Sequence, residues 1–207
     1  GAGKDGKAYS MKPVDGTGDF TFSRGSNLAA TRVGPTGLIE KGRENLLLQS
    51  NQFDTTWLNA GSTRTSGQSG YDGSSDAWLL ESANAGQSSI NQSVSQSGVQ
   101  TASVYAKAGT TDWMFLYLVG SPDKNAWFNL GNGTLGNTTG IDSSIESVGN
   151  GWYRCSVSYN VTISSIRIYL SDGNSNVSSA LGANIYIQDA QVEIGLAATD
   201  YIESGAT

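Results

Sequence analysis

The chain is divided into short runs of alternating apolar and polar residues, with turn-forming residues between the runs. Glycine, asparagine, aspartate and serine dominate the connecting segments, such as 70–76, 131–140 and 171–176, and these are the residues of turns between strands. No helical pattern separates the runs, so the sequence predicts an all-β sandwich rather than an alternating α/β fold. We expect strands at 77–81, 90–94, 102–106, 113–119, 126–130, 152–159, 165–170 and 184–193.

Period-two alternation within these runs separates an inward face from an outward face. The inward set is Tyr153, Cys155, Val157, Tyr159, Ile166, Ile168, Leu170, Phe128 and Leu130. The outward set combines aromatic rings with cations and consists of Tyr105, Lys107, Trp127, Arg154, Arg167 and Tyr169. In 113–119 two sets compete for the core, Met114, Leu116 and Leu118 against Trp113, Phe115 and Tyr117. Whichever set faces outward forms an exposed or groove-lining stripe.

Composition excludes several classes of function. The formal net charge of −6 argues against a general nucleic-acid binder, and no apolar run approaches the ~18 residues of a membrane span. The single cysteine, Cys155, excludes an internal disulfide framework and a cysteine-based zinc site. The lack of histidine removes Ser-His-Asp and Cys-His catalysis. An enzyme would depend on carboxylates, Tyr, Lys or Arg, and no pair of acids has a recognisable spacing.

The outward set has the chemistry of carbohydrate recognition. Flat aromatic faces pack against the C–H side of sugar rings, and guanidinium groups hydrogen-bond hydroxyls or carboxylates. We expect the set to share one face of a sheet. The stacking platforms would be Tyr105, Trp127 and Tyr169, and the polar anchors would be Lys107, Arg154 and Arg167. Protein interfaces are enriched in the same residue types, so an assembly surface is the alternative.

Four segments carry a resemblance to a known class of protein. They are DFTFSRGSNLAATRVGPTGLIE at 19–40, NLLLQSNQFDTTW at 45–57, SVYAKAG at 103–109 and GWYRCSVSYNV at 151–161. Their order resembles that of bacteriophage tail and tail-fibre structural proteins, in which a lead-in precedes a jelly-roll domain similar to carbohydrate-binding modules. The resemblance implies an extended N-terminal arm with a short strand-turn element over 1–44 and a jelly-roll β-sandwich over 45–207.

The same resemblance implies a function and a set of partners. It implies a non-catalytic carbohydrate-binding module in a phage virion, extracellular on release, that contacts host or environmental glycans. Other virion proteins are the expected protein partners, a homotrimer is the expected assembly of the parent protein, and neither nucleic acid nor a membrane is expected. Related modules often hold one structural Ca²⁺, for which the matching residues here are Asp54 and Asp189.

Two other functions stay open at this point. A structural or oligomerisation module of the tail would use the outward aromatic and basic residues as an interface and bind no sugar. A polysaccharide lyase or hydrolase would need Tyr, Arg or carboxylate chemistry from residues that show no catalytic spacing.

Overall fold

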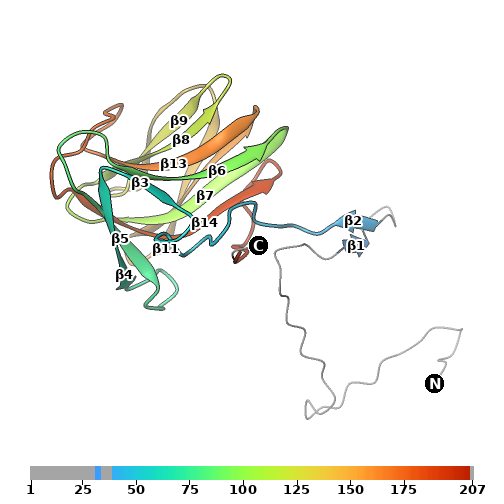
Figure 1. Cartoon of the computed structure of the whole chain (residues 1–207), viewed down its shortest axis with the longest axis horizontal. Coiled ribbons are helices and arrows are strands. Elements are labelled where there is room, and N and C mark those ends of the chain that lie inside the picture. Colours follow the sequence, from blue (N-terminus) through green and yellow to red (C-terminus); the bar gives the residue numbers. More distant parts are fainter. Residues whose placement is uncertain (1–30, 34–38, 206–207) are drawn as a thin grey trace, which may run out of the picture.

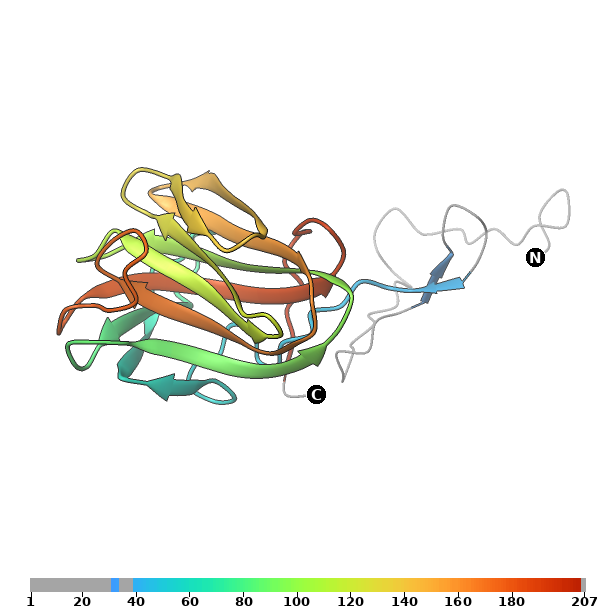
Figure 2. The same ribbon diagram turned by 90° about the horizontal axis from the view of Figure 1, so that it is seen from above.

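The computed structural model describes residues 31–33 and 39–205, and side chains from residue 42 onward. Its main body consists of two antiparallel sheets that pack face to face (Figures 1 and 2). The prediction of an all-β sandwich is confirmed. Of the arm predicted over 1–44, residues 1–30 and 34–38 lie outside the described residues, and the boundary between 44 and 45 stays a prediction.

We name the two sheets after a central strand of each. The β8 sheet has the order β10-β9-β8-β13-β6-β3, and the β7 sheet has the order β11-β12-β7-β14-β5-β4. The strands of the β8 sheet are β10 (Thr134–Thr138), β9 (Lys124–Asn129), β8 (Trp113–Gly120), β13 (Ile163–Ser171), β6 (Ser89–Gln96) and β3 (Leu58–Ala60). Those of the β7 sheet are β11 (Asp142–Gly149), β12 (Trp152–Asn160), β7 (Val99–Ala108), β14 (Asn184–Ile194), β5 (Ala77–Ser82) and β4 (Ser62–Gln68). A separate hairpin pairs β1 (Thr31–Val33) with β2 (Ile39–Lys41).

The core lies between the two sheets and contains the predicted inward residues. Cys155 and Val157 reach it from the β7 sheet, and Ile166 and Ile168 reach it from the β8 sheet. Tyr153 packs against its margin and is partly buried. The inward face predicted from the period-two pattern is therefore confirmed, because one side of every strand pair contacts the opposite sheet.

The ambiguity in β8 is resolved by the position of this strand. Met114, Leu116 and Leu118 join the core, so the alternate residues of β8 point away from it. Trp113, Phe115 and Tyr117 therefore lie on the outer face of the β8 sheet. Of the two forms expected for this stripe, the exposed one is wrong, because Phe115 is only 2% exposed and the other two rings are half-buried.

Every predicted strand is present, but four further strands of the two described six-stranded sheets were not predicted. These are β3, β4, β10 and β11, and each is an edge of its sheet. The segment 131–140, expected as a turn, contains β10. No helix in the described part of the chain is long and apolar enough to cross a membrane.

The segment 195–205 follows β14 and returns along the sandwich to the opening segment 45–50; we call it the closing segment. The Asn45 side chain donates hydrogen bonds to the carbonyls of Ala190 (2.9 Å) and Ile202 (3.0 Å). The backbone N–H of Gln49 donates to the carbonyl of Gly205 at 2.8 Å. These bonds fix the start and the end of the sandwich side by side.

Candidate functional site

The predicted carbohydrate-binding residues occupy two opposite outer faces of the sandwich. Trp127, Arg167 and Tyr169 belong to the β8 sheet, whereas Tyr105, Lys107 and Arg154 belong to the β7 sheet. The expectation of one shared face is therefore wrong. Alternation within a strand separates inward from outward residues, but a sandwich has two outer faces, and alternation does not say which one a strand contributes to.

On the outer face of the β8 sheet, stacked rings from three neighbouring strands form what we call the aromatic row: Trp127 of β9, Phe115 of β8 and Tyr169 of β13. The Phe115 ring stacks on Trp127, with 4.8 Å between centroids, and on Tyr169, with 4.5 Å between centroids. Such contacts between aromatic side chains add to the stability gained from burial.

The aromatic row is covered by the protein itself. The indole Nε1 of Trp127 donates to the carbonyl of Asn176 at 2.9 Å, and Asn174 in the same loop accepts a hydrogen bond from the backbone N–H of Asn137 in β10 at 2.7 Å. Trp127 and Tyr169 are consequently only 6% and 7% exposed. Little of either ring face is available to a ligand in this arrangement.

A second row, which we call the polar row, crosses the same face next to the aromatic row. Cross-strand pairing aligns Asn125 of β9, Tyr117 of β8, Arg167 of β13 and Asn91 of β6. All four side chains are half-buried. Neighbouring strands lie about 4.8 Å apart, so the row spans roughly 14 Å from Asn125 to Asn91.

Hydrogen bonds hold the ring and the cation of the polar row in place. Tyr117 donates from its hydroxyl to Asp123 at 2.6 Å, and this bond is the main reason that the pKa of Tyr117 is raised and that of Asp123 is lowered. The guanidinium carbon of Arg167 lies 5.9 Å from the centroid of the Tyr117 ring. Arg167 also donates from Nη1 to the hydroxyl of Tyr169 at 3.2 Å, which links the two rows.

Two buried polar atoms of the polar row have no hydrogen-bond partner. They are Oδ1 of Asn125 and Nε of Arg167. A buried donor or acceptor without a partner costs about 1–3 kcal/mol, so such atoms are uncommon and call for an explanation such as a bound water or ligand. They flank the half-buried ring of Tyr117, which gives the face an acceptor, a ring and a donor in one line.

The outer face of the β7 sheet is built differently. The Tyr105 ring stacks on Tyr71 with 3.8 Å between centroids and is only 8% exposed. The guanidinium carbon of Arg154 lies 5.2 Å from the Tyr105 centroid, and Trp152 is buried beside the tyrosines. Lys107 is half-buried on the same strand as Tyr105. The carbohydrate-binding role of these residues stays a prediction.

The two residues expected to bind Ca²⁺, Asp54 and Asp189, lie in different surroundings. Asp189 is buried at a bulge in β14, where its carboxylate accepts a hydrogen bond from the Tyr71 hydroxyl at 2.9 Å and its N–H donates to Asn51 at 3.1 Å. Burial raises the pKa of Asp189 to about 6. Asp54 is exposed. Ca²⁺ takes six to eight oxygen ligands, and the described residues hold no cluster of three or more acidic, histidine or cysteine side chains that could bind a metal ion.

A calcium requirement therefore stays a prediction, and it is checked by thermal melting. If the protein binds structural Ca²⁺, EDTA lowers the melting temperature and added CaCl₂ restores it, because a ligand of the folded state stabilises that state. Magnesium chloride at the same ionic strength is the control. A melting curve that is unchanged by EDTA, with no calcium found by elemental analysis, would remove the site.

Comparisons with known proteins find relatives among solved structures alone. No protein-family model matches the chain, and no curated protein matches it. The enzymatically active domain of tailspike protein 4 from bacteriophage CBA120 is 17% identical, with a TM-score of 0.43; the match covers 72% of this chain and 21% of that one. TmCBM61, solved with β-1,4-galactotriose, is 12% identical with a TM-score of 0.45 over 72% of this chain and 97% of that one. The CBM22-1 xylan-binding domain of Paenibacillus barcinonensis Xyn10C is 17% identical with a TM-score of 0.45 over 77% of this chain and 99% of that one. At these levels the likenesses carry no argument about ligand or activity.

Proposed function

We propose that this chain is a non-catalytic carbohydrate-binding domain that binds a glycan along the polar row of the β8 sheet. The observation that carries the proposal is the pair of buried polar atoms without partners, Asn125 Oδ1 and Arg167 Nε, on either side of the half-buried Tyr117 ring. A glycan crossing the strands would donate a hydroxyl to Asn125, lay a ring face on Tyr117 and accept a hydrogen bond from Arg167.

The polar row fits a sugar better than it fits other ligands. Its side chains combine donors, acceptors and a ring, and the one carboxylate bonded to the row, Asp123, sits opposite a single cation, Arg167. A strongly anionic polymer would need several cations, and an apolar ligand would leave the Asn125 and Arg167 atoms unpaired.

The same side chains support a proposal of binding without catalysis. Glycoside hydrolysis in most families uses two carboxyl groups on opposite sides of the scissile bond, whereas Asp123 supplies the one carboxylate that is hydrogen-bonded to the polar row within the described part of the chain. Cys155 is fully buried, and burial raises the pKa of its thiol, which disfavours a nucleophilic thiolate.

The setting that we propose is a phage virion, where the domain contacts host or environmental glycans. This part of the proposal rests on the sequence resemblance to tail and tail-fibre proteins. A virion carries many copies of such a domain, so weak binding at each copy sums to firm attachment.

The test uses glycan-array screening followed by titration calorimetry with a glycan that binds. Replacing Arg167 with alanine is expected to weaken binding by about 10- to 100-fold, because hydrogen bonds to a charged group contribute about 1.5–3 kcal/mol. Replacing Tyr117 with alanine is expected to weaken it by about 3- to 10-fold through loss of ring contact. Tyr186→Ala, a half-buried tyrosine on the β7 sheet, is the matched control and should bind like the unchanged protein.

Three outcomes would contradict this proposal. Undiminished binding by folded Arg167→Ala and Tyr117→Ala proteins would place the glycan elsewhere. Absence of binding to every glycan on the array, together with a stable oligomer in solution, would favour a structural or oligomerisation module. New reducing or unsaturated ends in a polysaccharide incubated with the protein would show that it is an enzyme.

A further inference from the structure

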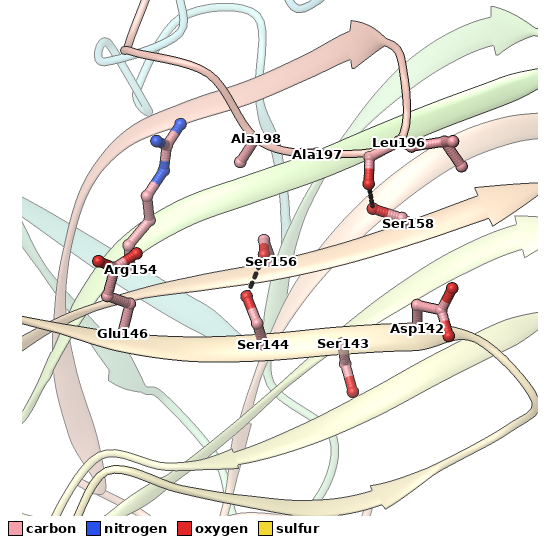
Figure 3. Close-up of a pocket in the computed structure, with 10 residues that line it drawn as sticks. All are labelled: Asp142, Ser143, Ser144, Glu146, Arg154, Ser156, Ser158, Leu196, Ala197 and Ala198. Carbon is pink, nitrogen blue, oxygen red and sulfur yellow. Dashed lines mark hydrogen bonds between the residues drawn. The ribbon is translucent and has the colours of Figure 1, made fainter.

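A pocket of about 320 Å³ lies on the outer face of the β7 sheet, whereas the polar row lies on the β8 sheet. Its floor is formed by β11 and β12, and its wall is the first part of the closing segment (Figure 3). The residues that line it are Asp142, Ser143, Ser144, Glu146, Arg154, Ser156, Ser158, Leu196, Ala197 and Ala198. Glu146 and Arg154 lie at one end of the pocket and Asp142 at the other (Figure 3).

The wall of the pocket is fixed by hydrogen bonds at both of its ends. At one end, the hydroxyl of Ser158 donates to the carbonyl of Leu196 at 2.9 Å. At the other end, Arg154 donates to the carbonyl of Thr199, while the buried Glu193 carboxylate accepts from the N–H of Thr199 at 2.8 Å and from its hydroxyl at 2.7 Å. The pocket is therefore preformed, and a ligand would not have to order the segment on binding.

The chemical groups that face the pocket are mostly available to a ligand. Asp142 and Glu146 are exposed on the same side of β11, and the structure gives their carboxylates no hydrogen bond or ion pair. Between them, Ser144 and Ser156 share one hydrogen bond of 2.8 Å across β11 and β12. Arg154 is the exception, since its Nε is buried and its Nη2 is bonded to Ser103 and Thr199.

An apolar surface stands opposite these polar groups. Leu196 is 76% exposed and is followed by Ala197 and Ala198 in the wall. A second depression, of about 510 Å³, continues past Leu196 and shares Asp142 and Ser158 with the first. The two depressions together can hold more than one unit of a linear ligand, and each has the size of a small-molecule site.

We propose that this pocket is a second saccharide-binding site, which takes a neutral, hydroxyl-rich sugar unit. Sugar hydroxyls would donate to Asp142 and Glu146 and exchange hydrogen bonds with the serines, while the C–H face of the ring would rest on Leu196. An anionic ligand is disfavoured because two carboxylates face the pocket against the one guanidinium of Arg154. The site has the ligand class of the proposed function but none of its residues, so the domain would bind glycans on two opposite faces.

The experiment is a titration of ¹⁵N-labelled protein with glucose, galactose, mannose and xylose, followed by amide chemical shifts. At least one sugar is expected to shift the amides of 144–146, 156–158 and 196–198 saturably. Glu146→Gln and Asp142→Asn keep the side-chain shape and remove the charge, and each should weaken this binding by about 3- to 10-fold. Glu81→Gln is the matched control, since Glu81 lies on β5 in the same sheet and does not line the pocket.

Ser156→Leu fills the pocket and should abolish these shifts. Shifts that persist in folded Ser156→Leu protein, or that are absent with all four sugars, would overturn the second site. Tyr117→Ala separates this result from the proposed function. Loss of the polar-row site leaves the shifts at 144–146 unchanged if the second site is independent, and shifts that vanish in Tyr117→Ala protein would show that the pocket does not bind on its own.

Discussion

Replacing Ile168 with alanine is expected to lower the free energy of unfolding by about 2–5 kcal/mol, the range for truncating a fully buried aliphatic side chain. Ile168 is 0% exposed, and its partners across the sheet, Leu116 of β8 and Ile90 of β6, are also completely buried. The truncation would leave a cavity lined by apolar side chains of both neighbouring strands. These side chains are too closely packed to move in and fill it, and the cavity would be too apolar to hold water.

Urea denaturation of the variant and the unchanged protein measures this effect, with m-values checked for equality. Arg167→Ala is the matched control, since Arg167 is the preceding residue and points to the opposite side of β13. Arg167→Ala should lower the free energy of unfolding by much less than Ile168→Ala does. Equal decreases in the two variants would overturn the assignment of the inward face.

Replacing Glu193 with alanine is expected to destabilise the protein by about 2–4 kcal/mol, because it would leave buried donors without an acceptor. Glu193 is 2% exposed and accepts hydrogen bonds from the Gln191 side chain at 2.6 Å and from Thr199. The Gln191 amide would lose its partner at a fully buried position, and the N–H and hydroxyl of Thr199 would lose theirs at a partly buried one. The loss should also loosen the pocket wall, since Thr199 fixes one end of it.

Thermal and urea unfolding of Glu193→Ala, compared with Glu146→Ala, tests the expected loss of stability. Glu146 is an exposed glutamate of the same sheet whose removal should change stability by no more than about 0.5 kcal/mol. Amide hydrogen exchange at 196–199 should accelerate in Glu193→Ala alone. Similar unfolding curves for the two variants, or unchanged exchange at 196–199, would contradict the role given to Glu193.

Sequence patterning predicted the central strands and missed the edges for a physical reason. A central strand packs one face on the core, so its apolar residues alternate, as in β12 and β13. An edge strand such as β10, with the sequence TLGNT, is largely exposed and buries too little to need that pattern. Its glycine and asparagine then predict a turn, although its backbone pairs with β9.

The candidate site was predictable in its residue types and not in its arrangement. The stripe of Trp113, Phe115 and Tyr117 was visible in the sequence as one of two alternatives, and Arg167 was correctly placed outward. The covering of Trp127 depends on Asn176, in a polar loop whose sequence signals only a turn. Membership of the polar row depends on strand order, which places β13 and β6 beside the consecutive strands β8 and β9 although they lie far from them in the chain.

The bonds between the opening and closing segments have a mechanical consequence. Asn45 and Gln49 hold the closing segment at Ile202 and Gly205, so the chain enters and leaves the sandwich at adjacent points. A pull applied at the two ends of the sandwich is expected to load these bonds before any strand of either sheet is drawn out of register. The strands that carry both outer faces would then bear the load only after the closing segment has come away.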